Sequence, residues 1–154
     1  MKLINETLNE DFKRGGGDAL GNMGIGKKYL IESWLDSIKI SDYELDENLE
    51  INVLNGTSTW LNFNSTIKNT LPDYIQFNIV AGSFNANECD LISLKGCPRK
   101  VTGTFFCSRN YNLRSLEGAP LYIGGSFYCR LNNIPENEKK RYTSIAKIAA
   151  EIYW

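Results

Sequence analysis

Apolar residues between positions 80 and 134 recur with a fixed period and at alternating positions, a pattern that predicts short stacked strands. Three copies of one motif, a glycine followed two residues later by a phenylalanine, are spaced 21 and 22 residues apart. Their phenylalanines are Phe84, Phe105 and Phe127. Two positions further on, each copy has a small residue, and these residues are Ala86, Cys107 and Cys129. Alternation with period two puts both members of a pair on the same side of a strand, so the copies are expected to stack as a solenoid.

The residues after each strand follow the spacing of a leucine-rich repeat. In the first copy, Cys89, Leu91 and Leu94 come 5, 7 and 10 residues after the phenylalanine, as in that repeat. Asn110 and Asn132 occupy the equivalent of position 89 in the next two copies, although the second copy has one extra residue after Asn110. An Asn side chain there can bond backbone groups exposed where the chain turns away from the strand. The predicted fold class is an α+β solenoid, a short leucine-rich-repeat-like stack of parallel β-strands.

A fainter copy precedes these three, because Leu61 and Leu71 are ten residues apart, like Phe84 and Leu94. The alignment of this copy with the other three is uncertain by one residue. Residues 51–53 are expected to add a strand before it, so that the solenoid covers residues 51–134.

Both flanks are predicted to be helical caps. One apolar face in residues 27–40 comprises Leu30, Ile31, Trp34, Leu35 and Ile38. A second stripe, after Pro135, comprises Tyr142, Ile145, Ile148, Ala149 and Ile152, and its 3-4 spacing is typical of an amphipathic helix. The chain is therefore divided into an N-terminal helical cap or leader (1–50), the solenoid (51–134) and a C-terminal capping helix (135–154).

Composition changes this picture mainly by exclusion. The 154 residues include no histidine, which removes Ser-His-Asp and Cys-His catalysis and histidine metal sites. No apolar run approaches the length of a membrane span, and no carboxylate pair or activated serine converges on a site. We therefore expect no enzyme, no catalytic residue, no cofactor and no membrane association.

The four cysteines are expected to fill the core. Cys89, Cys97, Cys107 and Cys129 are separated by 8, 10 and 22 residues, which matches no CxxC zinc arrangement. Inward positions in the repeat suit cysteine as a compact apolar residue. No metal site is predicted.

The repeat resembles the short leucine-rich-repeat-like proteins of tailed bacteriophages, which repeat units of the form SLEGAP-x-x-V-G-G-x-F-x-C-S-x-N-x-L. The resemblance covers about residues 71–134, and GIGKKYLIESWLD is similar to the leader found before such repeats. It implies a viral protein that acts in the cytoplasm of an infected bacterium with its cysteines reduced. It also implies a host bacterial protein as partner, whose inhibition could serve against host defence.

Residues that alternate outward along the strands form the predicted partner-binding face. They are Asn85, Asn87, Thr104, Phe106, Ser108, Ser126, Tyr128 and Arg130, with Trp60 from the faint copy. Phe106 and Tyr128 are expected to be neighbours, with Arg130 beside them. Aromatic and arginine side chains among small polar ones are typical of binding hot spots. Aromatic stacking that only stabilises the sheet, or a cap folded over the face, explains the pattern equally well.

A glycine-rich stretch, GGGDALGNMGIGKK, allows three interpretations. Gly21 to Lys27 match the start of a phosphate-binding loop, but Lys28 stands where that loop needs Ser or Thr. The second interpretation is a hairpin that holds a nucleic-acid phosphate at a helix start. The third, which we favour, is a simple entry loop to the helix.

Charge supports two alternative functions. Residues 1–50 carry 6 basic and 11 acidic groups (−5), residues 51–96 carry 2 and 3 (−1), and residues 97–154 carry 9 and 4 (+5). The basic third could bind nucleic acid or a nucleotide ligand through Arg99, Lys100, Arg109, Arg114 and Arg130. Alternatively, Trp154 and the last apolar stripe could pack between chains in a self-assembling protein. The oligomeric state stays open.

Overall fold

The computed structural model describes residues 19–54, 59–60 and 69–154. Helix α2 (Ala19–Ser37) comes first, and helix α3 (Glu136–Ile145) lies near the C-terminal end. The strands are β1 (Tyr43–Leu45), β2 (Ile51–Val53), β3 (Thr59–Trp60), β4 (Phe77–Val80), β5 (Phe84–Asn85), β6 (Lys100–Val101), β7 (Phe105–Phe106), β8 (Tyr122–Ile123), β9 (Phe127–Tyr128), β10 (Lys147–Ile148) and β11 (Ile152–Tyr153).

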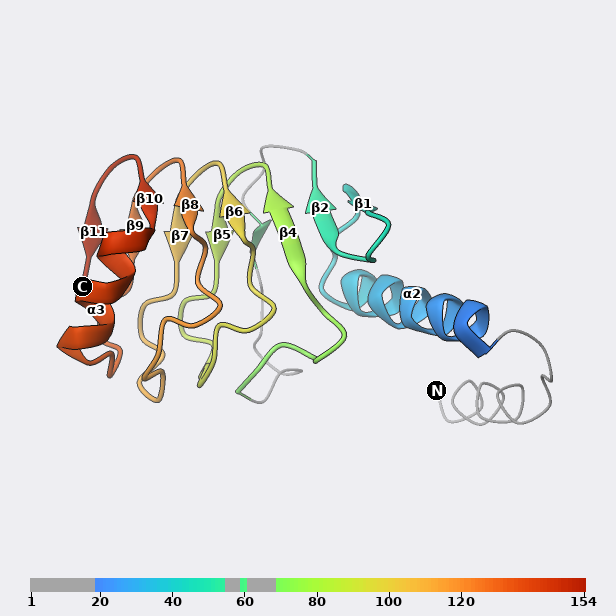
Figure 1. Cartoon of the computed structure of the whole chain (residues 1–154), viewed down its shortest axis with the longest axis horizontal. Coiled ribbons are helices and arrows are strands. Elements are labelled where there is room, and N and C mark those ends of the chain that lie inside the picture. The colour runs from blue at the N-terminus through green and yellow to red at the C-terminus, as the bar shows by residue number, and fades with distance from the viewer. Residues whose placement is uncertain (1–18, 55–58, 61–68) are drawn as a thin grey trace.

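The strands form a β-solenoid in which each coil contributes to two sheets. Sheet A has the order β1-β2-β4-β6-β8-β10 and sheet B the order β11-β9-β7-β5-β3. Every pairing is parallel except that of β1 with β2. Figure 1 shows the coils side by side, with α2 at the β2 end and α3 at the opposite end. The prediction of stacked parallel strands is confirmed. The repeat pattern predicted one strand in each coil, whereas the structure has a second strand, in sheet A.

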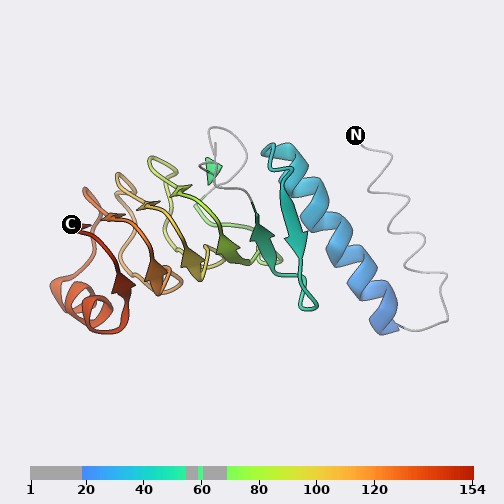
Figure 2. The same cartoon turned by 90° about the horizontal axis from the view of Figure 1, so that it is seen from above.

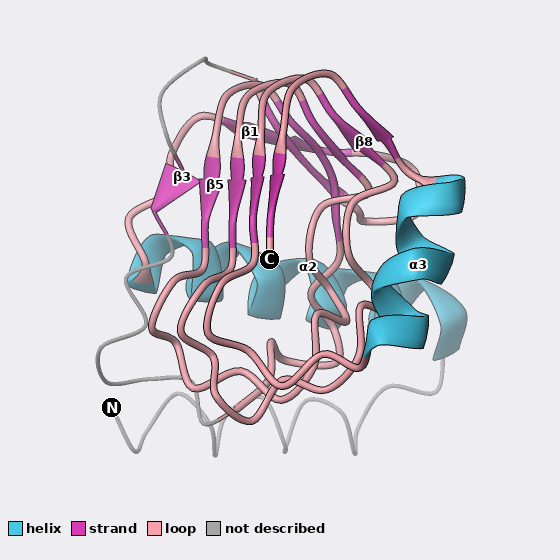
Figure 3. Cartoon of the chain, turned by 90° about the vertical axis from the view of Figure 1, so that its left-hand side faces the viewer, coloured by secondary structure: helices cyan, strands magenta, loops and turns pink. Residues whose placement is uncertain are grey.

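The two sheets meet at a corner that is lined mainly by small residues. Seen along the stack, they converge along one edge, and the return arcs close each coil on the other side (Figure 3). At this corner a Cβ on Gly124 would lie 2.1 Å from the Thr102 carbonyl oxygen, and one on Gly125 would lie 2.6 Å from Thr104 Oγ1. A side chain at either of these two positions would collide with the preceding coil, so glycine allows close approach of the coils there. In the last coil Ala149 and Ala150 occupy this corner, and the Ala150 N–H donates to the Gly125 carbonyl.

A column of aromatic rings runs through the core. Phe77, Phe84, Phe105 and Phe127 are fully buried, and their successive ring centroids are 5.5, 5.6 and 5.6 Å apart. Trp34 of α2 joins one end of the column, with its ring 6.2 Å from Phe77. Tyr142 of α3 contacts Phe127 near the other end, at 5.3 Å. Each coil contributes apolar surface that it could not bury alone.

The predicted asparagine ladder is confirmed in detail. Asn110 is fully buried, and its Oδ1 accepts the N–H groups of Cys89 and Leu91 from the preceding coil. Its Nδ2 donates to the carbonyls of Ala86 and Cys107. Asn132 repeats the arrangement one coil later by accepting the Asn110 N–H. These amides satisfy backbone groups that the turn leaves without strand partners.

The C-terminal prediction was only partly right. A helix does begin after Pro135, but it ends at Ile145, and the chain then returns to add β10 and β11. Ile148 and Ile152 therefore pack on the core from strands instead of extending a helical stripe. The interval from Phe127 to Ile152 is 25 residues in place of 22, because α3 occupies the return arc. That longer interval conceals the last copy of the repeat.

Two N-terminal predictions also need correction. The glycine-rich stretch is not a loop from Ala19 onward, because Gly21, Gly24 and Gly26 lie within α2. Neither a phosphate-binding loop nor a hairpin is formed there. In the faint copy Thr59 pairs with Phe84 and Trp60 with Asn85, so the register differs from the predicted one by two residues. Leu61, on which the prediction was based, lies outside the described residues.

Candidate functional site

The outward side of sheet B carries a continuous stack of three aromatic rings. Phe106, Tyr128 and Tyr153 occupy equivalent positions in β7, β9 and β11. The centroids of Phe106 and Tyr128 are 5.0 Å apart with planes 17° from parallel, and those of Tyr128 and Tyr153 are 4.4 Å apart at 12°. We call these three residues the aromatic column. All three side chains are half-buried, so they present ring edges to solvent while their faces cover one another.

The predicted contact between Phe106 and Tyr128 is confirmed, and Arg130 lies beside the column. The Arg130 guanidinium carbon is 5.0 Å from the Tyr153 ring centroid, within the range of a cation–π contact. Arg130 itself is exposed. The same face thus combines apolar ring edges with a guanidinium group that can donate hydrogen bonds to a carboxylate of a partner.

Tyr153 was missed as a site residue because residues 146–154 were assigned to a helix. Its hydroxyl hydrogen-bonds the Glu151 carboxylate, and this bond, with desolvation and the Tyr128 hydroxyl, raises the pKa of Tyr153 to about 12. The Tyr153 hydroxyl is therefore neutral at physiological pH. The signal that could have found Tyr153 is the motif Ala-Ala-Glu-Ile-Tyr-Trp, which aligns with Gly-Gly-Ser-Phe-Tyr-Cys at residues 124–129.

Most of the predicted polar site residues hold neighbouring coils together. Asn87 Oδ1 accepts the Ser108 N–H at 2.7 Å, and Ser108 Oγ accepts the Arg130 N–H at 3.1 Å. In a second row, Thr104 Oγ1 accepts the Ser126 N–H at 3.3 Å, and Ser126 Oγ accepts the Glu151 N–H at 3.5 Å. These side-chain oxygens were predicted to bind a partner protein, but here they accept backbone N–H groups of the next coil. The bonds hold the surface around the aromatic column in place.

The remaining two predicted residues, Asn85 and Trp60, precede Phe106 in the strand register of sheet B. Asn85 stands in the column position before Phe106, and its Oδ1 accepts the Asn87 N–H at 2.9 Å. Trp60 precedes Asn85 in the same register. Five residues occupy equivalent positions in successive strands of sheet B, and in order along the stack they are Trp60, Asn85, Phe106, Tyr128 and Tyr153.

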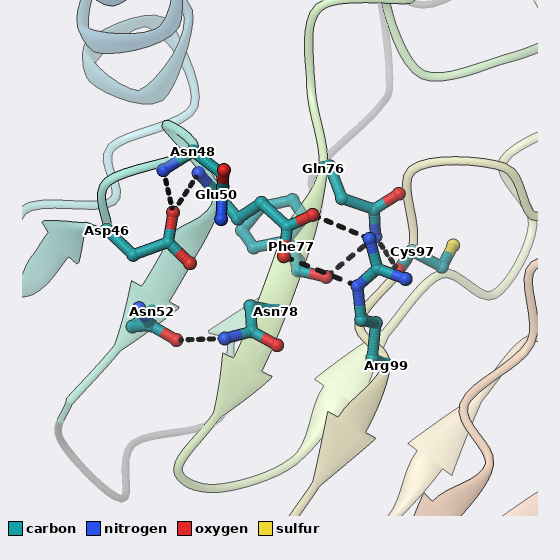
Figure 4. Close-up of polar contacts among 9 residues, drawn as sticks. All are labelled: Asp46, Asn48, Glu50, Asn52, Gln76, Phe77, Asn78, Cys97 and Arg99. Atoms are coloured by element: carbon teal, nitrogen blue, oxygen red, sulfur yellow. Dashed lines mark hydrogen bonds and ion pairs between the residues drawn. The ribbon is translucent and has the colours of Figure 1, made fainter.

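The basic residues of the alternative nucleic-acid prediction are partly paired with carboxylates. Arg99 makes a paired contact with the Glu50 carboxylate, 2.6 Å at its shortest (Figure 4), and Arg109 contacts Glu88 at 2.6 Å. Lys100 lies on sheet A, with its ammonium 4.8 Å from the Tyr122 ring. Arg109 and Arg130 are neighbours in successive coils, since the Arg109 N–H donates to the Arg130 carbonyl at 2.8 Å, and Arg114 is exposed. The carboxylates paired with Arg99 and Arg109 reduce the positive charge, and binding of nucleic acid stays a prediction.

The acidic run at residues 42–50 has a structural role. Asp46 Oδ1 accepts the N–H groups of Asn48 and Glu50, both at 2.9 Å, and so builds the turn between β1 and β2. Beside it, the Gln76 side-chain amide donates to the carbonyls of Phe77 and Cys97, and Asn78 donates to Asn52 Oδ1 (Figure 4). The polar groups in this region bond one another.

A groove of about 440 Å³ lies between the return arcs and α3. Its lining includes Lys95, Arg99, Glu117, Leu121, Arg141 and Ile145. Arg99 is paired with Glu50, and Arg141 with Glu138 at 3.2 Å. Both arginines of the groove are therefore already paired with carboxylates. Among the described residues there is no group of three or more His, Cys, Asp or Glu side chains arranged to hold a metal ion, and no helix long and apolar enough to cross a membrane.

The thiols lie in the core, as predicted. All four are buried and reduced. Burial raises the pKa of Cys97 and of Cys107 above the ordinary thiol value. A buried neutral thiol is a poor nucleophile.

The chain matches no family model, no curated protein and no solved structure.

Proposed function

We propose that this protein is a non-enzymatic binding module that contacts a partner protein through the outward side of sheet B. The stacked, half-buried aromatic column, with exposed Arg130 beside it, is the observation that supports the proposal. Aromatic and arginine side chains dominate the energetics of protein interfaces. The partner is expected to offer a carboxylate to Arg130 next to an apolar patch.

The rows of side-chain to backbone bonds favour this use of the face. A surface that is already ordered loses little conformational entropy when a partner binds. Strand pairing fixes the backbone positions of the three aromatic residues, and stacking of their rings favours one arrangement of the column.

The resemblance to the short leucine-rich-repeat-like proteins of tailed phages supplies the biological setting of the proposal. In that setting the two helices act as caps of the repeat, the protein works in the bacterial cytoplasm, and its partner is a host protein. Inhibition of a defence component is the purpose that this setting favours.

Affinity capture from bacterial lysate tests the proposal. The tagged protein is expected to enrich one host protein in the presence of nuclease, and Phe106→Ala with Tyr128→Ala is expected to abolish that enrichment. A matched control on the other sheet is Lys100→Ala with Tyr122→Ala, which removes an exposed cation and aromatic ring.

Two results would count against the proposal. Unchanged capture by the Phe106/Tyr128 variant would remove sheet B as the binding face. Enrichment that disappears with nuclease would favour the nucleic-acid alternative instead.

A further inference from the structure

Two cysteines lie next to each other in the inward column of sheet B. That column contains Ala86, Cys107, Cys129 and Trp154, which follow β5, β7, β9 and β11. Backbone bonds hold Cys107 and Cys129 in register, because the Cys107 N–H donates to the Tyr128 carbonyl and the Cys129 N–H to the Tyr153 carbonyl. Both side chains point into the core, where Cys107 is fully buried and Cys129 is 3% exposed.

One side-chain amide faces both sulfurs. Asn132 Nδ2 lies 3.1 Å from Cys129 Sγ and 4.0 Å from Cys107 Sγ, and it also donates to the carbonyls of Cys107 and Cys129 at 3.0 and 3.2 Å. An amide N–H stabilises a thiolate more than a thiol, since it donates to the developing negative charge. The neighbouring Cys107 thiol, the Asn132 amide and the Lys139 charge lower the pKa of Cys129, whereas burial raises the pKa of Cys107.

We propose that Cys107 and Cys129 form a two-sulfur binding site for a soft monovalent cation such as Cu(I). Thiolate sulfur is the ligand that selects Cu(I) among the first-row metals. With the zinc–sulfur bond of about 2.3 Å as a guide, a cation held linearly between two sulfurs separates them by about 4.6 Å. The backbones of neighbouring strands are about 4.8 Å apart, so two cysteines in register on adjacent coils start near this separation.

The chemistry of binding involves no oxidation. Each thiol loses its proton to solvent, two metal–sulfur bonds form, and the cation keeps its charge. The site then carries one net negative charge, which the Asn132 amide and nearby Lys139 offset. Zinc is excluded by coordination number, because a structural zinc site takes four ligands, and the described residues supply no third cysteine, aspartate or glutamate there.

Anaerobic titration with Cu(I), buffered by the chelator bicinchoninate and read by native mass spectrometry, tests this site. The wild-type chain is expected to take up one copper ion, and Cys107→Ala or Cys129→Ala is expected to lose it. Cys97→Ala removes another buried thiol and is expected to retain the ion. No uptake by the wild type, uptake by either variant of the pair, or loss in Cys97→Ala would overturn the proposal.

X-ray absorption of the copper-loaded wild type gives a second test that does not depend on whether the variants fold. Two sulfur neighbours in linear geometry are expected. Three or more ligands, or nitrogen and oxygen neighbours in place of sulfur, would contradict the site. A mass loss of two hydrogens without bound copper would mean that the pair forms a disulfide instead.

Discussion

The two sides of sheet B carry aromatic columns of similar spacing but different environment. On the inner side Phe84, Phe105 and Phe127 are fully buried, with centroids 5.6 Å apart. On the outer side the aromatic column has spacings of 5.0 and 4.4 Å, and its rings remain half-buried. Strand pairing imposes nearly the same stacking on both.

This difference in burial indicates that the fold requires the inner rings but does not require the outer ones. Interior rings fill the space between coils, and smaller residues would leave cavities. Outer rings add stacking but little burial, so the solenoid could form with small polar residues there, as it does at Asn85. We infer that large aromatic residues at optional positions serve a partner rather than stability. Figure 2 shows how the coils follow one another along the stack.

The largest effect is expected from truncating the inner column. Phe105→Ala should lower the free energy of unfolding by about 3–5 kcal/mol, because it leaves a ring-sized cavity in a buried position. Phe106→Ala, one residue away and on the opposite side, should cost about 1 kcal/mol from lost stacking. Urea unfolding of both variants measures this contrast. Equal losses would show that the outer column is as structural as the inner one.

The next largest effect concerns the buried asparagine ladder. Asn110→Ala leaves the N–H groups of Cys89 and Leu91 without their acceptor, at a cost of roughly 2–4 kcal/mol for two buried donors. The neighbouring side chain of Tyr111 is 58% exposed, and Tyr111→Ala should change stability by less than about 0.5 kcal/mol. Thermal unfolding compares the two. A mild effect of Asn110→Ala would mean that water replaces the amide.

These contrasts indicate how far sequence could go. Period and alternation were enough to predict the stacked strands, the inner phenylalanines, the ladder amides and the contact of Phe106 with Tyr128. Two-residue strands in sheet A were not predicted, because pairs such as Lys100-Val101 carry too little alternation to stand out.

The last coil could not be predicted for a different reason. Ile148 and Ile152 are four residues apart, a spacing that fits a helical face as well as two strands around a corner. Only the contacts with Ile123 and Phe127 decide between the two. Tyr153 therefore escaped the predicted site, and the roles of Asn87 and Ser108 within the coil stack required three-dimensional register.

A smaller effect is expected from the outer polar rows. Asn87→Ala removes the acceptor of a 2.7 Å bond from the Ser108 N–H and should cost about 0.5–1.5 kcal/mol. Ser126→Ala removes only a 3.5 Å contact, so its stability should be close to that of the wild type. Chemical denaturation of the pair checks the ranking. The reverse order would contradict the assignment of these rows.

The smallest effect is expected on the pKa of Tyr153, which should change while the protein stays folded. Hydrogen bonding to Glu151 raises the pKa of Tyr153 to about 12, so Glu151→Gln should move it back toward 10. The Tyr153 hydroxyl holds its proton more tightly in the folded state than in the unfolded state. Its contribution to the free energy of unfolding is therefore complete below pH 10 and is lost between about pH 10 and 12. Tyrosinate absorbance near 295 nm follows the change, with Glu117→Gln as the control. An unchanged titration curve for Glu151→Gln would disprove the link.

Site-specific photo-crosslinking tests the binding face most directly. A benzoylphenylalanine is placed at Tyr128, on the outer side of sheet B, or at Tyr122, on the outer side of sheet A, and irradiated in bacterial lysate treated with nuclease. The account predicts one discrete protein adduct from position 128 and none from position 122. Adducts from position 122 alone, or equal adducts from both, would contradict binding through the aromatic column.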